Sequence, residues 1–147
     1  MSTKRKIVIG MLTLVCGVML LFAAEVFIMA NSGKLMPLME ENIGKSTSEI
    51  RQYSPELVQF LFTPIKAVSA LLLSLSVVVL LVLYGPFRKN AKWANCSVFT
   101  PLIVWLISAI WIYSSQSSAP WQIWLVLLVL VLVALALTLT ERSAHKA

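Results

Sequence analysis

The sequence predicts an all-α protein, an integral membrane four-helix bundle with both termini in the cytoplasm. Three observations predict this fold class. The chain is 59% hydrophobic and only 12% charged, its apolar residues fall into four long runs, and its basic residues gather at the ends of those runs. Because soluble proteins carry about 25% charged residues, a chain of this composition requires lipid as the solvent for most of its length.

The clearest apolar run is 121–140, WQIWLVLLVLVLVALALTLT, which contains no charge, no Gly and no Pro. A helix of about 20 residues is about 30 Å long, which matches the hydrocarbon core of a bilayer. Helices that are apolar on every side are buried in lipid or in the core of a large protein. We therefore predict a single membrane domain over residues 1–147. Its four spans are predicted to cover about 7–29, 65–84, 93–113 and 121–140.

The first span follows a short basic segment, MSTKRK. A basic segment before an apolar run is also typical of a signal peptide, whose apolar region is usually about 7–15 residues long. The run at 7–30 is longer than this, although Ala23 and Ala24 offer a cleavage site. We expect an uncleaved first helix.

The longest polar segment lies at about 31–56 and is predicted to form an extracytoplasmic loop. Its opening tripeptide, Asn31-Ser32-Gly33, is typical of a helix end. One interpretation of the next residues is a short interfacial helix over 34–42. The apolar side chains that such a helix would turn toward lipid are Leu35, Met36, Leu38 and Met39. The alternative is a solvated loop whose helical turns are frayed.

Two helix starts lie in the second half of this segment. Ser46-x-x-Glu49 matches a capping box, which predicts a short helical turn over 47–52. The tripeptide at 54–56, Ser-Pro-Glu, places a cap, a proline and an acid in the order typical of a helix start. We expect the helix that begins there to extend to Tyr84.

The second and third spans are bounded by glycine, proline and aromatic residues. Gly85 and Pro86 are expected to end the second span. Trp93 lies at one end of the third span, and Trp111 and Tyr113 lie at the other. Aromatic residues at both ends of a span form the belts that are typical of membrane interfaces.

The basic residues indicate how the spans are oriented. On one side of the predicted spans lie Lys4, Arg5, Lys6, Arg88, Lys89, Lys92, Arg142 and Lys146. On the other side lie Lys34, Lys45 and Arg51, with Lys66 near the boundary. Because loops rich in Lys and Arg stay in the cytoplasm, both termini and the middle turn are predicted to lie there, in a bacterial inner membrane. The net charge of +6 is then a topology signal and a contact with anionic lipid headgroups, and it does not indicate nucleic-acid binding.

Glu25 and Lys66 are the charged residues within or close to the apolar spans. At 1.5 Å per residue, both lie roughly 27–29 Å from the cytoplasmic ends of their helices, near the outer interface. One hypothesis is an ion pair between them, because pairing offsets part of the cost of a charge in lipid. The alternatives are two side chains that reach the headgroups separately, and a proton- or cation-linked site.

Small residues repeat every seven positions along the first span, at Gly10, Gly17 and Ala24. Small side chains let a second helix backbone approach closely, so this stripe is predicted to be a helix-packing surface. The spacing is not that of a GxxxG motif, and it therefore favours packing more than it favours dimerisation.

The sequence lacks the residue sets of a catalytic or metal site. The single histidine is His145, and Cys16 and Cys96 form no CxxC pair. We therefore predict no catalytic residue, no metal and no cofactor. Small multidrug exporters also have four spans and an acid in the first, but their acid lies in the middle of the membrane. Glu25 lies near the outer edge and departs from that pattern.

The turn between the second and third spans reads Phe87-Arg88-Lys89-Asn90-Ala91-Lys92-Trp93-Ala94. This basic segment followed by Trp-Ala resembles a turn of small bacterial four-helix membrane proteins, of which the DoxX-like group is one set. The resemblance covers residues 87–94 together with the hydropathy pattern. It implies a four-helix membrane fold and no functional residues.

These features predict a small multi-pass inner-membrane protein with a non-enzymatic accessory or interaction role. Its expected contacts are the lipid bilayer and either another membrane protein or a second copy of the chain. Two alternatives stay open. One is a small proton- or cation-linked transporter that uses Glu25, and the other is an immunity-type membrane protein.

Overall fold

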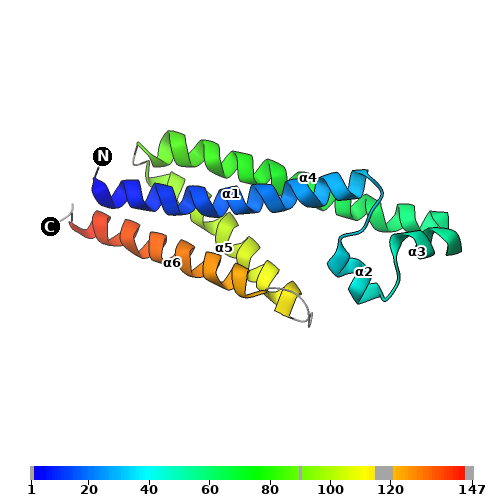
Figure 1. The fold of residues 1–147 in the computed structure, drawn as a ribbon. Helices are drawn as coiled ribbons and strands as arrows, with labels where there is room; N and C mark the ends of the chain where they lie inside the picture. The colour runs from blue at the N-terminus through cyan, green and yellow to red at the C-terminus, as the bar shows by residue number, and fades with distance from the viewer. Residues whose placement is uncertain (1, 90, 115–120, 145–147) are drawn as a thin grey trace. The chain divides into compact units, whose positions relative to one another are not determined.

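The computed structural model describes residues 2–89, 91–114 and 121–144, without the side chains of Leu38, Asn42 and residues 142–144. These described residues form helices joined by short connections, and they contain no strand (Figure 1). The helices in chain order are α1 (Thr3–Asn31), α2 (Pro37–Ile43), α3 (Thr47–Tyr53), α4 (Pro55–Val82), the π-helical turn η1 (Leu83–Phe87), α5 (Lys92–Ser114) and α6 (Trp121–Ala144). The predicted all-α class is confirmed.

Four of the helical segments in the described part of the chain are long and apolar enough to cross a membrane. They are Thr3–Asn31, Pro55–Phe87, Lys92–Ser114 and Trp121–Glu141. Each contains one of the predicted spans, and the first two extend beyond their predicted spans by several residues. The chain therefore has the composition and the helix lengths of a multi-pass membrane protein.

The end of α1 has the geometry that Asn31-Ser32-Gly33 predicts. The Gly33 N–H donates to the Ala30 carbonyl at 3.3 Å, and the Lys34 N–H donates to the Met29 carbonyl at 3.1 Å. Gly33 itself has a φ of +71°, which is the left-handed conformation that favours glycine. This combination is a Schellman motif, which satisfies the last carbonyls of a helix.

The predicted helix stop at Gly85 and Pro86 is wrong, because both residues lie inside η1. The Arg88 N–H donates to the Leu83 carbonyl at 3.2 Å, and the Ala91 N–H donates to the Pro86 carbonyl at 3.0 Å. Both bonds reach back five residues, which is the spacing of a π-helix. Proline has no N–H and its ring crowds the preceding turn of an α-helix. The wider π turn accommodates both effects, so the helix continues to Phe87.

The chain forms two compact units. The loop unit consists of residues 19–75, and the terminal unit consists of residues 1–18 and 76–147. Helices α1 and α4 each contribute residues to both units. The single-domain organisation stays a prediction.

The terminal unit has a core in which α5 packs against α6 (Figure 1). Its buried side chains include Val8, Leu12 and Val15 from α1, Val98, Leu102 and Leu106 from α5, and Leu127, Val131 and Ala134 from α6. Trp124 joins the two last helices, because its ring lies 5.0 Å from that of Trp105 and 5.8 Å from that of Tyr113, centroid to centroid. Trp105 therefore contributes to a protein core.

The loop unit has a separate core. Its buried side chains are Ala30, Leu35, Ile50, Val58 and Phe62, and the partly buried Met39, Leu61 and Ile65 pack against them. The segment between α1 and α4 is therefore folded, and the alternative of a solvated loop with frayed helical turns is wrong. Leu35 also faces this protein core and not lipid, because it buries its side chain against apolar partners from α3 and α4.

Candidate functional site

The segment 32–54, which we call the head, is held by a hydrogen-bonded link between α2 and α3. The Thr47 N–H and the Thr47 hydroxyl donate to Glu40 Oε1 at 2.7 and 2.5 Å. The Thr47 hydroxyl oxygen in turn accepts the Leu35 N–H at 3.0 Å. Since these bonds favour the ionised carboxylate, the hydroxyl and the N–H of Thr47 hold the pKa of Glu40 below its ordinary value of 4.5.

The start of α3 carries the predicted capping box. The Glu49 N–H donates to Ser46 Oγ at 3.3 Å, and the Ser46 N–H donates to Glu49 Oε2 at 2.7 Å. Both halves of the reciprocal arrangement are present, so this prediction is confirmed. The N–H and the hydroxyl of Ser46 lower the pKa of the Glu49 carboxyl.

Arg51 fastens α3 to the end of α1. Its Nη2 donates to the Gly33 carbonyl at 3.0 Å. A Cβ added at Gly33 would lie 2.9 Å from that same Nη2 atom. Gly33 is therefore needed both for its left-handed backbone and for the close approach of Arg51.

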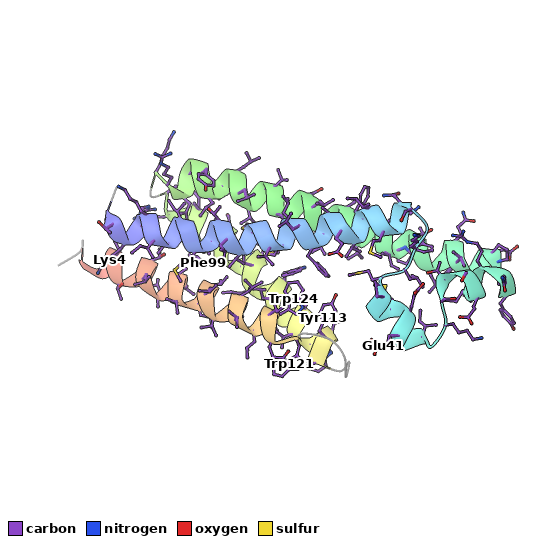
Figure 2. All side chains as sticks on the ribbon, viewed as in Figure 1. Lys4, Glu41, Phe99, Tyr113, Trp121 and Trp124 are labelled. Carbon is purple, nitrogen blue, oxygen red and sulfur yellow. The ribbon has the colours of Figure 1, made fainter. Side chains whose placement is uncertain are left out.

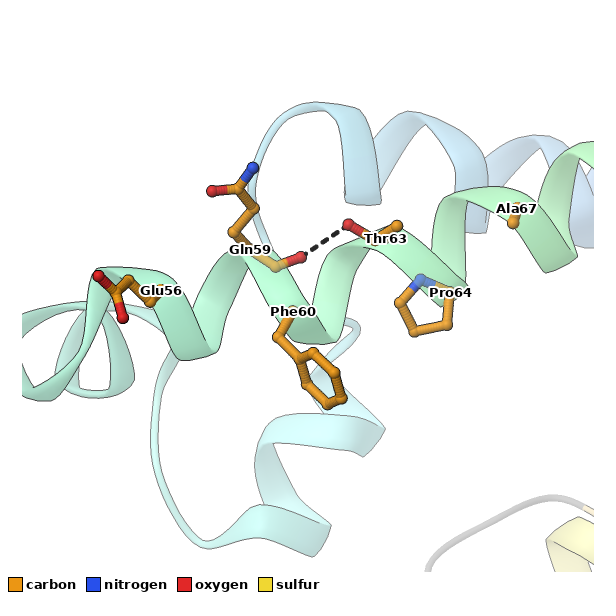
Figure 3. A pocket seen from close by; sticks show the side chains of 6 residues that line it. All are labelled: Glu56, Gln59, Phe60, Thr63, Pro64 and Ala67. Carbon is orange, nitrogen blue, oxygen red and sulfur yellow. Dashed lines mark hydrogen bonds between the residues drawn. The ribbon is translucent and has the colours of Figure 1, made fainter.

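An open depression of about 550 Å³ lies on α4 just after the head (Figure 3). Its lining consists of Glu56, Gln59, Phe60, Thr63, Pro64 and Ala67. The Thr63 hydroxyl donates to the Gln59 carbonyl at 2.9 Å. Because proline has no N–H, Pro64 cannot form the usual helical hydrogen bond to the Phe60 carbonyl. Phe60 is 75% exposed. The depression therefore combines an exposed aromatic ring, polar groups and one carboxylate.

The residues predicted to set the topology lie in the terminal unit. Five of these six side chains are exposed, those of Lys4, Lys6, Arg88, Lys89 and Lys92. Arg5 is instead buried and donates from Nη2 to the Phe87 carbonyl. Lys4 marks this end of α1 in Figure 2. The hydroxyl of Ser2, which precedes α1, also donates to Glu141 of α6.

Glu25 and Lys66 both lie in the loop unit, on α1 and on α4. Glu25 is exposed and Lys66 is half-buried. No ion pair joins them within the described ranges 2–89, 91–114 and 121–144. The pair, and a transport role for Glu25, stay predictions.

The stripe of small residues on α1 has open space beside it. A Cβ added at Gly10 or Gly17 would meet no atom within 4 Å in the described structure. Ala24 is half-buried. Helix packing on this stripe therefore stays a prediction.

The reactive side chains do not converge. Cys16 is buried and Cys96 is exposed, and both are free thiols. In the described part of the chain, no three His, Cys, Asp or Glu side chains are grouped in a way that could hold a metal ion. His145 lies outside the described residues.

Sequence reasoning missed the two contacts made by the arginines, Arg5 with Phe87 and Arg51 with Gly33. Each contact joins residues that are far apart in the sequence, and no local sequence pattern predicts it. The helix end predicted at Asn31-Ser32-Gly33 locates the glycine of the second contact but does not indicate its partner. Comparison of the chain with protein-family models, with curated proteins and with solved structures gave no significant match.

Proposed function

We propose that this chain is a small multi-pass inner-membrane protein with a non-enzymatic accessory role, and that its head and the α4 depression bind a second membrane protein. The folded head is the observation that carries the proposal. Two antiparallel helices need a connection of only about 2–8 residues. Ordering each further residue costs about 1–2 kcal/mol of conformational entropy. A longer connection that packs Leu35 and Ile50 against residues of α1 and α4 therefore indicates a use for that structure.

The exposed side chains indicate the chemistry of the partner. Phe60 is 75% exposed on α4, and Tyr53 is 83% exposed at the end of α3. Aromatic residues are enriched at protein interfaces, where their burial contributes much of the affinity. Glu56 supplies a negative charge to the depression, and the described residues that line it include no cation. We infer a partner helix that packs an apolar side chain against Phe60 and brings a Lys or Arg to Glu56.

A photo-crosslinking residue placed at position 60 in native membranes tests this proposal. The matched control is position 81, because Leu81 is also apolar and is 68% exposed in the other unit. We expect one defined adduct with a different membrane protein at position 60 and none at position 81. The substitution Glu56→Lys should abolish the adduct, because it places two like charges together.

A charge exchange completes this test. Once mass spectrometry identifies the partner, replacing its crosslinked basic residue by Glu should restore the adduct in the Glu56→Lys background. Adducts with lipid alone, or with a second copy of this chain, would contradict an accessory role that depends on a different protein.

The proposed topology rests on the distribution of basic residues. The positive-inside rule puts both termini and the turn at 88–92 in the cytoplasm and the head on the opposite side. A transporter that uses Glu25 is the second candidate, although Glu25 does not line the α4 depression. The immunity-type role and membership of the DoxX-like group gain no support beyond the sequence patterns themselves.

A further inference from the structure

Arg5 is a buried cation that has no anionic partner in the described structure. Its side chain is 8% exposed, and its guanidinium carbon lies 5.2 Å from the centroid of the Phe87 ring. One of its five N–H donors is used by the Phe87 carbonyl, and Nε is buried without a hydrogen-bond partner. A charge removed from water is costly unless an opposite charge compensates it. The carbonyl and the ring stabilise the cation, but they do not neutralise its charge.

Further cations lie close to this contact on both segments that it joins. The exposed ones are Lys4, Lys6, Arg88, Lys89 and Lys92. Together with Arg5 they form the basic end of the terminal unit. Because Arg5 contacts Phe87, it holds the first turn of α1 beside the turn that leads into α5. The nearby Glu141 side chain accepts a hydrogen bond from Ser2 and forms no ion pair with these cations in the described residues. The summed field of the basic end is therefore strongly positive.

Apolar and aromatic side chains border the basic end. Ile7 is 50% exposed, Tyr84 is 51% exposed and Trp93 is 59% exposed. The Tyr84 hydroxyl shares a hydrogen bond with the Thr13 hydroxyl and so lies further along α1. On a membrane-spanning helix, Trp lies at the level of the lipid headgroups, with apolar residues in the hydrocarbon beyond it. The neighbouring cations are then placed at the level of the headgroup phosphates.

We propose that the basic end binds the headgroup of an anionic phospholipid, with the acyl chains of that lipid along the exposed apolar faces of α1, η1 and α5. A phosphate group supplies the anion that Arg5 and the surrounding cations lack. The apolar border distinguishes a lipid from a soluble phosphate, because only a lipid also covers that surface. The proposal goes beyond the accessory role, which depends on the head.

The experiment is a lipid titration of the full chain, purified in a neutral detergent and followed by native mass spectrometry. The probes are phosphatidylglycerol and phosphatidylcholine with the same acyl chains. We expect phosphatidylglycerol to bind at least about thirtyfold more tightly, since each basic residue near an anionic lipid surface contributes about fivefold and at least two take part. The double substitution Lys6→Gln/Lys89→Gln should then weaken that binding by about thirtyfold.

Two further variants keep the test decisive. Lys34→Gln/Lys45→Gln removes the same charge from the head and should leave lipid binding unchanged. Lys6→Arg/Lys89→Arg keeps the charge and should retain binding, which separates a lost site from a lost fold. Equal affinity for the two lipids, or equal weakening by the head variant, would overturn the proposal. Displacement of phosphatidylglycerol by millimolar inorganic phosphate would assign the site to a soluble anion instead.

Discussion

In the head, Glu40 and Glu49 each receive hydrogen bonds from a hydroxyl and an N–H of one neighbouring residue, Thr47 and Ser46. At the basic end, Arg5 is buried against a carbonyl and an aromatic ring, and it has no carboxylate partner in the described chain. These two carboxylates are therefore satisfied within the head, whereas the basic end leaves a buried positive charge without an anion in the described chain. This difference suggests a folded recognition element in one unit and an anion-binding surface in the other.

The apolar core of the head gives the largest expected effect. Phe62→Ala should destabilise the head by about 3–5 kcal/mol, because truncating a buried Phe removes its packing and leaves a cavity. Amide hydrogen exchange over α2 and α3 in detergent measures this loss. Phe60→Ala is the matched control, because Phe60 is 75% exposed whereas Phe62 is 6% exposed. Equal effects of the two substitutions would show that the head does not depend on this core.

The contact of Arg5 at the basic end gives the next largest effect. Arg5→Ala should destabilise the terminal unit by about 1.5–3 kcal/mol, which is the usual contribution of a hydrogen bond to a charged group. Thermal unfolding in a neutral detergent without added lipid measures the change. Lys6→Ala, at an exposed neighbouring position, should shift stability by less than about 0.5 kcal/mol. If Arg5→Ala instead stabilises the protein without lipid, the free-energy cost of burying the charge exceeds the stabilisation from its contacts with Phe87.

The pH dependence of the head gives the smallest effect. The bonds from Thr47 lower the pKa of Glu40 below 4.5, so this carboxylate is ionised in both the folded and the unfolded head at neutral pH. Its stabilising contribution is therefore complete above pH 4.5 and is lost as the pH falls through the lowered pKa. Hydrogen exchange over α2 and α3, corrected for its intrinsic pH dependence, should show protection that decreases only in acid.

Two substitutions sharpen this measurement. Glu40→Gln should flatten the acid-dependent loss of protection, with Glu49 as the remaining titrating cap. Glu41→Gln, on the exposed neighbouring residue, should leave the profile of the native chain unchanged. A head whose protection is constant down to pH 2 would contradict a role for these carboxylates in holding it.

The sequence determined the apolar helices, the capping box at Ser46 and the helix end at Gly33. Those features depend on composition and on hydrogen bonds between residues a few positions apart, and such information is contained in any short window of the chain. The tertiary structure decided which side chains face inward. It buried Leu35 in the head, separated the exposed Phe60 from the buried Phe62, and placed Arg5 against a residue far away in the chain. Local patterns cannot specify such contacts, because a buried position depends on which distant segment supplies its neighbours.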